Sequence, residues 1–233
     1  MAGGIVAIIP ARGVDPDSPH GPESLLAGKP VLAYTIDAAK ASRVLDRVIV
    51  TTDSPSVAVL ARRCGAEAPF LRPAHLAVGG VPMVSVLQHA VRWLEEEDRS
   101  PVRVVVVLEV THPLRPVGLI DSVVDVLQRE QLDTVFAARE ERHRFWRAAD
   151  GGLVQVEPED GDRTRDRVQP VYKELAGMAS AVRAEVIRAG QRVGAKVGLV
   201  PVRGPESAVD LHDADGWALA EHWLAAAGQG ELA

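Results

Sequence analysis

The sequence contains a single cysteine, Cys64, and few aromatic side chains. A lone cysteine excludes an intramolecular disulfide framework and a zinc site built from several thiolates. No apolar run approaches the ~20 residues that a transmembrane helix requires, and the short apolar start lacks the basic segment of a signal peptide. We therefore expect a soluble, cytoplasmic protein that has no membrane partner.

Positive charge is also scarce. The chain has 26 basic and 32 acidic residues, a net charge of −6, so nucleic acid is not expected to be a partner. Lysine occurs only at Lys29, Lys40, Lys173 and Lys196. With 47% hydrophobic and 25% charged residues in 233 positions, the composition predicts one globular domain, residues 1–233.

Short β-branched segments alternate with amphipathic stretches along most of the chain. Strands are predicted at residues 5–9, 48–51, 66–71, 102–108, 134–137 and 196–202, and helices at 30–42, 82–96, 119–128 and 213–227. A further helix is predicted to begin after a cap at Asp53 or Ser54, and Asp53 is interpreted as a cap rather than as a ligand contact. This alternation predicts an α/β fold with a mostly parallel sheet and helices on both faces. Such sheets bind ligands beyond the carboxyl ends of their strands.

The alternation is interrupted between residues 140 and 170, where the sequence is charged and rich in turn-forming residues. We interpret this segment as an insertion that belongs to an arm spanning residues 140 to 180. A disordered loop is the alternative interpretation. Periodic apolar positions return at residues 181–187.

Several common enzyme motifs are absent from the sequence. No Gly-x-Gly-x-x-Gly follows the first predicted strand, and Ala-Gly-Lys-Pro at residues 27–30 lacks the Ser or Thr of a Walker A loop. Neither His-Glu-x-x-His nor Gly-x-Ser-x-Gly occurs. A dinucleotide-binding Rossmann domain and a serine hydrolase of the nucleophile-elbow type are therefore disfavoured.

Seven segments in register carry the functional signal of the sequence. They are Ile8–Gly13, Leu26–Ile36, Asp46–Asp53, Arg62–Glu67, Pro69–Pro73, Thr111–Arg115 and Val209–Leu211. In this order they resemble the acylneuraminate cytidylyltransferase family, the CMP-sialic acid synthetases and their relatives. The resemblance runs from residue 4 to about residue 225. It implies a nucleotide-diphospho-sugar transferase-like, Rossmann-related fold.

The same resemblance implies a reaction between CTP and an acidic sugar. The anomeric hydroxyl of a sialic acid-like 2-keto sugar acid attacks the α-phosphorus of CTP, and the products are a CMP-sugar and pyrophosphate. Catalysis of this kind depends on positioning and on neutralising phosphate charge. The family further implies Mg²⁺ as cofactor and a homodimer that pairs through the arm.

The loop after the first predicted strand departs from the family pattern, which has two lysines there. Aligned without gaps, the lysine positions hold Pro16 and Gly21, and only Arg12-Gly13 is kept. The resemblance assigns Arg12 and Gly13 to the nucleotide, with Arg12 as a catalytic phosphate contact and a structural ion pair as its alternative. His20 is interpreted as a surface histidine and is a weaker candidate cation.

Three further positions match the family's nucleotide site, namely Arg72, Glu109 and Thr111. Glu109 stands where the family has glutamine, and an ionised carboxylate only accepts hydrogen bonds. It can accept from the exocyclic amine of cytosine, although guanine offers a similar edge. Its structural alternative is an ion pair with Arg115 or Arg72. For Arg72 the alternative is a loop-fixing hydrogen bond to backbone carbonyls.

The family's paired metal carboxylates correspond here to Asp210 and His212. Alternation along an extended segment turns both side chains to one side. Because Mg²⁺ prefers oxygen ligands, His212 suits Mn²⁺ better. Asp213 is a substitute ligand if the backbone bulges, or else the N-cap of the last helix. Asp210 is therefore the second expected catalytic residue.

The acceptor side is less specific. Positions that match the family's arm, together with Arg115, are candidate contacts to a carboxylate or phosphonate of the substrate, since arginine binds such groups in a bidentate manner. Each has an alternative role in a solvated face or a dimer contact. The residues are Arg115, His143, Trp146, Arg147, Tyr172, Lys173 and Glu174.

Two other functional classes stay open at this point. One is a non-catalytic relative that keeps the fold as a binding or assembly partner after losing the phosphate loop. The other is a glycosyltransferase that uses a bound sugar nucleotide, which the Ala-Gly-Lys-Pro and Leu-Arg-Pro matches disfavour.

Overall fold

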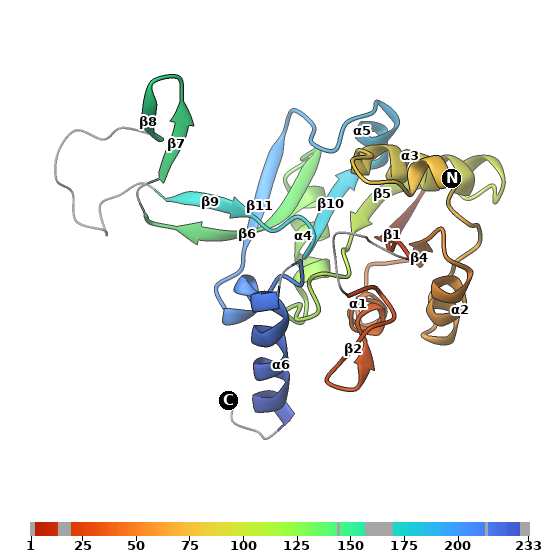
Figure 1. Cartoon of the computed structure of the whole chain (residues 1–233). Coiled ribbons are helices and arrows are strands. Elements are labelled where there is room, and N and C mark those ends of the chain that lie inside the picture. Colours follow the sequence, from red (N-terminus) through yellow and green to blue (C-terminus); the bar gives the residue numbers. More distant parts are fainter. Residues whose placement is uncertain (1–2, 14–19, 144, 157–169, 213, 229–233) are drawn as a thin grey trace.

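Seven strands form one mixed sheet at the centre of the molecule (Figure 1). The computed structural model describes residues 3–13, 20–143, 145–156, 170–212 and 214–228. The strand order is β11-β6-β10-β5-β1-β4, and β9 also pairs with β6. The strands are β1 Gly4–Pro10, β4 Arg47–Thr51, β5 Val102–Val107, β6 Thr134–Glu141, β9 Val171–Glu174, β10 Ser180–Arg183 and β11 Val197–Pro201.

Helices pack on both faces of the sheet, and the side chains of β1 alternate between them. Ile5, Ala7 and Ile9 belong to the apolar cluster that includes the first, second and fourth helices. Val6 and Ile8 belong to the cluster of the third and fifth helices on the other face. The predicted fold class is therefore confirmed. The helices are α1 Val31–Lys40, α2 Pro55–Arg63, α3 Met83–Glu96, α4 Leu119–Arg129, α5 Ala184–Arg188 and α6 Ala214–Gly228.

One periodic segment and one predicted strand take a form in the structure that the sequence did not specify. Residues 181–187 divide into the end of β10 and the helix α5, and β10 runs antiparallel to both neighbours, β5 and β6. Residues 66–71 make only isolated bridges, Ile49 with Glu67 and Thr52 with Leu71. The interrupting Pro69 has no amide hydrogen to donate, so a continuous ladder cannot form there.

The arm begins where β6 extends past the sheet and pairs with β9. The strands β7 Phe145–Ala149 and β8 Gly152–Val156 form a hairpin at its tip. Trp146 and Leu153 on this hairpin are 56% and 70% exposed, and Tyr172 on β9 is 39% exposed. Residues 157–169 lie outside the described part of the chain. Within the described part of the chain, no helix has the length and apolarity needed to cross a membrane.

Candidate functional site

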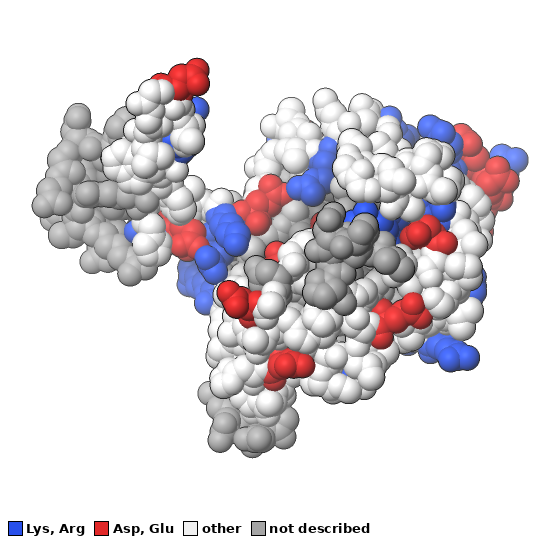
Figure 2. All heavy atoms as spheres, viewed as in Figure 1, with Lys and Arg blue, Asp and Glu red and all other residues white. Residues whose placement is uncertain are grey.

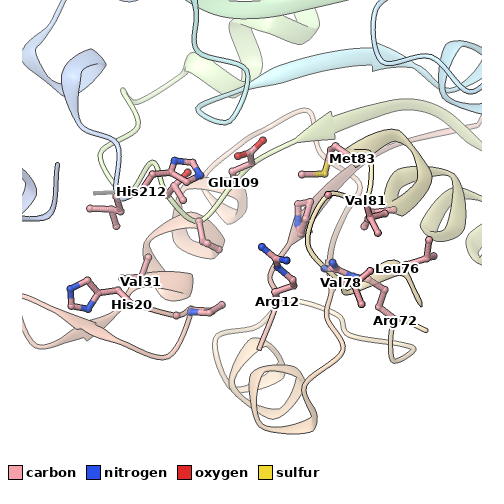
Figure 3. Close-up of a pocket in the computed structure, with 18 of the residues that line it drawn as sticks. Arg12, His20, Val31, Arg72, Leu76, Val78, Val81, Met83, Glu109 and His212 are labelled. Atoms are coloured by element: carbon pink, nitrogen blue, oxygen red, sulfur yellow. The ribbon is translucent and has the colours of Figure 1, made fainter. Parts of the chain in front are cut away.

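A cavity of about 230 Å³ opens beyond the carboxyl ends of β1 and β5. This is the edge where an open α/β sheet binds its ligands. Figure 3 shows its two ends, with Arg12 and Glu109 between them. One end is polar and aromatic, with His20, His212 and Trp217; the other is apolar, with Leu76, Val78, Val81, Met83 and Val86.

Arg12 and Gly13 leave the end of β1 beside the cavity. Arg12 lines the cavity, and in Figure 3 its guanidinium points toward the side that carries Glu109. The amide of Gly13 donates to Oδ1 of Asp53 at 3.1 Å. A Cβ on Gly13 would lie 2.4 Å from Cβ of Ser54, so only glycine fits there. Gly13 is not one of the described residues that line the cavity. Its role is to let the backbone pass close to Ser54.

The cap of α2 is Ser54, whose hydroxyl accepts from the amide of Val57 at 3.4 Å. Of the two predicted caps Ser54 is therefore the one used, and the interpretation of Asp53 as a cap was wrong, because its carboxylate accepts from the amide of Gly13. Asp53 thus ties the loop after β1 to the loop after β4. This hydrogen bond fixes the backbone next to Arg12.

Arg72 lines the cavity, but it is 6% exposed and its guanidinium faces the backbone. One terminal nitrogen donates to the carbonyl of Thr51, and Nε donates to Oγ1 of Thr51 at 3.4 Å. Burial lowers the pKa of Arg72 to about 10, with Asp53 opposing this and Arg12 adding to it. Arg72 thus makes the loop-fixing hydrogen bond to a backbone carbonyl that its alternative role describes.

Glu109 follows β5 and is held through its backbone. Its amide donates to the carbonyl of Gly177 at 2.8 Å, and its own carbonyl accepts from Arg115. Burial raises the pKa of the Glu109 carboxyl, with smaller opposing effects from His212 and Arg192. Glu109 lines the cavity. The ion pair with Arg115, one form of the structural alternative, is replaced by a bond from Arg115 to the backbone carbonyl of Glu109.

Arg115 lies behind the cavity and is not one of the described residues that line it. Its Nε donates to the carbonyl of Met178 at 2.6 Å, and one terminal nitrogen donates to Oγ1 of Thr35 at 2.8 Å. The other terminal nitrogen donates to the carbonyls of Glu109 and Gly177. Burial lowers the pKa of Arg115 to about 9. These bonds make Arg115 a framework residue, a correction to its predicted contact with substrate.

His112 is a buried residue that the sequence analysis did not single out. It is 7% exposed, and its Nδ1 lies 3.0 Å from Oγ1 of Thr111, which lines the cavity. Burial lowers the pKa of His112 to about 4. A Cβ on Gly177 would lie 2.9 Å from Cε1 of His112 and 2.9 Å from Cδ of Glu109. Gly177 therefore allows both side chains to occupy this corner.

Asp210 and His212 meet on one side of their segment, as alternation predicted. Nδ1 of His212 lies 2.5 Å from Oδ1 of Asp210. Burial raises the pKa of Asp210, but the bond from His212 and the nearby His112 outweigh it, so the net pKa is lowered. His212 lines the cavity and directly supports the carboxylate. Asp213 lies outside the described residues.

The side chains near the cavity can be compared with what the Mg²⁺ ion implied by the family resemblance needs as ligands. The described residues contain no group of three or more His, Cys, Asp or Glu side chains suited to hold a metal ion. Mg²⁺, however, commonly binds through one or two carboxylates together with substrate phosphates and water. The ionised Asp210 fits that mode, in which the substrate brings most of the ligands.

The predicted acceptor residues of the arm lie away from the cavity lining. Figure 2 shows acidic and basic side chains mixed where the arm joins the sheet. There Glu174 pairs with Arg192 at 2.6 Å, and His143 lies 3.1 Å from Glu141. Trp146 is exposed on the hairpin. Arg147 and Tyr172 also belong to the arm, and Lys173 is near enough to His112 to lower its pKa.

Sequence reasoning missed the apolar end of the cavity and the aromatic contact at its polar end. The apolar end is formed by the loop between Arg72 and α3 and by the first residues of α3, and the sequence signal in that loop was apolar side chains beside Gly79-Gly80. At the other end His20 stacks on Trp217, with ring centroids 3.8 Å apart and an interplanar angle of 22°. No spacing links these two residues, because 196 positions separate them in the sequence.

Comparison with known proteins identifies related sequences. A family model described as cytidylyltransferase matches residues 6–172. The chain is 29% identical over 143 residues to a pseudaminic acid cytidylyltransferase of Campylobacter jejuni, covering 61% of each chain. It is 41% identical over 86 residues to an N-acylneuraminate cytidylyltransferase of Escherichia coli, which covers 37% of this chain and 20% of the relative. The matches thus span less than two thirds of these relatives.

Solved structures share the fold at low sequence identity. A CMP:2-keto-3-deoxy-manno-octonic acid synthetase complexed with CTP has a TM-score of 0.67 at 14% identity, covering 95% of this chain and 98% of that one. A 4-diphosphocytidyl-2C-methyl-D-erythritol synthase from Anaerococcus prevotii has a TM-score of 0.65 at 16% identity, covering 96% and 99%. These likenesses support the fold, and the sequence matches support the family.

Proposed function

Because the chain belongs to the cytidylyltransferase family, we propose that it transfers CMP from CTP to an acidic sugar and releases pyrophosphate. The acceptor class follows from relatives named for pseudaminic acid, N-acylneuraminate and 3-deoxy-manno-octulosonate. The non-catalytic alternative is not favoured, since the relatives are named as enzymes. The cavity at the carboxyl edge of the sheet is the observation that carries this proposal.

The cavity offers separate surroundings for the two parts of a nucleotide. Its apolar end, lined by Leu76, Val78, Val81 and Met83, suits the base and ribose, which lose little by leaving water there. Arg12 at the centre supplies a planar cation for a phosphate. Glu109 accepts a hydrogen bond from the exocyclic amine of cytosine or from the acceptor sugar.

The proposed chemistry is an in-line displacement at the α-phosphorus. The acceptor oxygen bonds to this phosphorus, the bond to the bridging oxygen breaks, and pyrophosphate leaves while the hydroxyl gives its proton to solvent water. Arg12 stabilises charge on the phosphates, and Asp210 is the residue that would hold Mg²⁺. When bound, Mg²⁺ (or Mn²⁺) would neutralise phosphate charge and orient the triphosphate.

Pyrophosphate release is the direct test of this function. The protein is incubated with each of the four nucleoside triphosphates, Mg²⁺ or Mn²⁺, and a panel of 2-keto sugar acids including pseudaminic and N-acylneuraminic acids. We expect release with CTP that requires both the acid and the metal. Tight, metal-independent binding of CTP without any turnover would instead identify a binding protein.

We also propose that the protein acts in the cytoplasm as a homodimer in which the arm crosses to the other subunit. Trp146, Leu153 and Tyr172 leave apolar surface exposed on the arm, and a second copy would cover it. Sedimentation at micromolar concentration should give twice the mass of one chain. A monomer under these conditions would contradict this arrangement.

A further inference from the structure

Glu109 brings a carboxyl group to the middle of the cavity. It follows the carboxyl end of β5 and lines the cavity. Figure 3 shows its carboxyl between His212 at the polar end and Met83 where the apolar end begins. A nucleotide whose base occupies the apolar end changes from ribose to phosphate at this point. Glu109 therefore faces the part of the cavity where the reacting phosphate would lie.

The backbone of Glu109 is held by several segments of the chain. Its amide donates to the carbonyl of Gly177 at 2.8 Å, and its carbonyl accepts from the amide of His112 at 3.4 Å. The same carbonyl accepts from a terminal nitrogen of Arg115 and from Oγ1 of Thr35 at 3.5 Å. Because these bonds fix the main chain, the direction of the carboxyl group depends on the side chain alone.

Gly177 forms a wall behind that carboxyl group. A Cβ on Gly177 would lie 2.9 Å from Cδ of Glu109 and 2.9 Å from Nδ1 of His112. Both groups thus pack against the bare Cα of the glycine. The imidazole of His112 is buried, and its Nδ1 lies 3.0 Å from Oγ1 of Thr111. The carboxyl group is therefore enclosed on the side of the protein.

The oxygens of this carboxyl group are open to the cavity. Among the described residues, no group donates a hydrogen bond to them. This includes Asp210 and His212, which are bonded to each other. In the described part of the chain, Nδ1 of His89 is the fully buried side-chain nitrogen or oxygen that has no partner. The oxygens of Glu109 are therefore unpartnered and still accessible from the cavity.

Burial also makes this carboxylate a stronger base. It raises the pKa of the Glu109 carboxyl, and the charged groups that face it change the pKa less. His112 adds no charge at neutral pH, because burial lowers its own pKa to about 4. The facing charged groups are His212, Arg192 and Arg115, which oppose the increase, and Asp210, which adds to it.

The charge of Glu109 restricts what it can contact in the reaction. A carboxylate repels phosphate oxygens, and as an acceptor it requires a hydrogen-bond donor. The exocyclic amine of cytosine is a donor that keeps its protons, whereas the attacking hydroxyl must lose one. A carboxylate with a raised pKa takes up such a proton more readily than an ordinary one. The attacking hydroxyl is therefore the donor that Glu109 suits.

We propose that Glu109 is a catalytic residue that accepts the proton of the acceptor hydroxyl as its oxygen attacks the α-phosphorus. The O–H bond breaks as the new O–P bond forms, and pyrophosphate leaves with the bridging oxygen. The protonated carboxyl then passes its proton to solvent water. The family pattern has glutamine at this position, whose amide takes up no proton near neutral pH, so the step belongs to this chain. This inference rests on the proposed function and decides between the two hydrogen bonds that it leaves open for Glu109.

Steady-state kinetics of the full-length protein test this inference. CTP and the 2-keto sugar acid that supports pyrophosphate release are the substrates, and the variant is Glu109→Gln, which keeps the shape of the side chain. We expect kcat to fall about 10²-fold at neutral pH, as for the loss of a general base. KM for CTP should stay within about twofold. The exposed Glu130→Gln is the matched control and should behave as the parent does.

The pH profile of kcat reports the proton transfer itself. In the parent, kcat should decrease as the pH falls through the raised pKa of Glu109, because the carboxylate is then protonated. Glu109→Gln should lose this part of the profile. A parent kcat that does not change with pH would overturn the inference, and this measurement requires no variant.

Rescue by a small carboxylate separates a base from a structural role. In Glu109→Ala, added acetate can occupy the space that the side chain leaves. We expect kcat of this variant to rise with the concentration of acetate, whereas acetate should not change kcat of the parent. The absence of rescue in a folded Glu109→Ala protein that binds CTP would contradict the role as base.

The outcomes separate this inference from the proposed function. If the parent releases pyrophosphate and Glu109→Gln does so at the same rate, the function stands and the inference fails. If Glu109→Gln weakens CTP binding in calorimetry without lowering kcat, the contact is to cytosine and the inference also fails. A parent that releases no pyrophosphate with any acid of the panel would overturn both.

Discussion

The arginines that hold the backbone around the cavity differ in their partners from the arginine at its centre. Arg115 behind the cavity and Arg72 in its lining are surrounded by protein and donate to backbone carbonyls and threonine hydroxyls. Arg12 lines the open cavity at the end of β1. A buried guanidinium must satisfy its donors within the protein. The described partners of Arg72 and Arg115 are thus parts of the protein itself, whereas the role proposed for Arg12 is a contact to the nucleotide.

The largest effect is expected from a substitution that removes the side-chain donors of Arg115 behind the cavity. Arg115→Met removes the donor to the carbonyls of Glu109, Gly177 and Met178, and an unsatisfied buried acceptor costs about 1–3 kcal/mol. We expect the free energy of unfolding in urea to fall by about 3 kcal/mol or more. Arg129→Met is the control, since Arg129 is 60% exposed and pairs with Asp125 at the surface, which is worth at most about 1 kcal/mol. Equal stabilities of the two variants would refute the framework role.

His112 should make the framework sensitive to acid. Its pKa is about 4 in the folded protein because burial lowers it, while an unfolded histidine has a pKa of about 6.5. Between these values the unfolded chain binds more protons, so stability decreases as the pH falls from about 6.5 to about 4, by on the order of 3 kcal/mol. Urea unfolding across this range should show the decrease, and His112→Gln should reduce it. A stability that does not change with pH in the parent would contradict this account.

Variants of the lining should impair activity and leave the fold intact. Arg12→Lys keeps the charge but loses the planar fork, and Asp210→Asn removes the anionic oxygen. We expect each to lower kcat/KM by ~10²-fold, about 2.7 kcal/mol of transition-state stabilisation, with Tm unchanged. Arg43→Lys and Asp125→Asn are matched exposed controls. Normal turnover in both lining variants would place the reaction elsewhere in the protein.

The smallest effect is expected at Glu109, which lines the cavity and is held in place through its backbone. Burial raises the pKa of Glu109, so the folded protein holds this proton to higher pH than the unfolded chain does. Its contribution to stability is present below the ordinary pKa of glutamate and is lost as the pH rises through the raised value. Glu109→Gln should therefore raise Tm at pH 8 and have little effect at pH 4, whereas Glu130→Gln at an exposed site should do neither. The same Tm shift at both pH values would show that titration of Glu109 is not the cause.

Much of the fold followed from local patterns. The apolar runs at Ile5–Ile9 and Val102–Leu108 predicted buried strands, and the structure places their apolar side chains in clusters on both faces of the sheet. The split of residues 181–187 into β10 and α5 was not predicted. An antiparallel strand between two others uses the same alternating side chains as a parallel one, so its direction leaves no local mark.

Parts of the candidate site were also predictable. Arg12, Glu109, Thr111 and His212 line the cavity, and Asp210 meets His212. Arg115 could not be assigned correctly, because its partners at Thr35 and Met178 are distant in sequence. Ser54 and Asp53 can each cap α2. Which of them does so depends on Gly13, a residue distant in sequence whose amide binds the Asp53 carboxylate.

The sequence by itself determined the alternation of strands and helices, the edge of the sheet where ligands bind, and the resemblance to cytidylyltransferases. These depend on periodicity and on motifs, which are local properties of the chain. Only the tertiary structure decided which basic groups face the cavity. Whether Arg115 serves the backbone, or His20 stacks on Trp217, depends on which distant residue lies within a few ångströms. The physical reason is that burial and hydrogen-bond partners, which set the availability of a charge, come from elements far apart in the sequence.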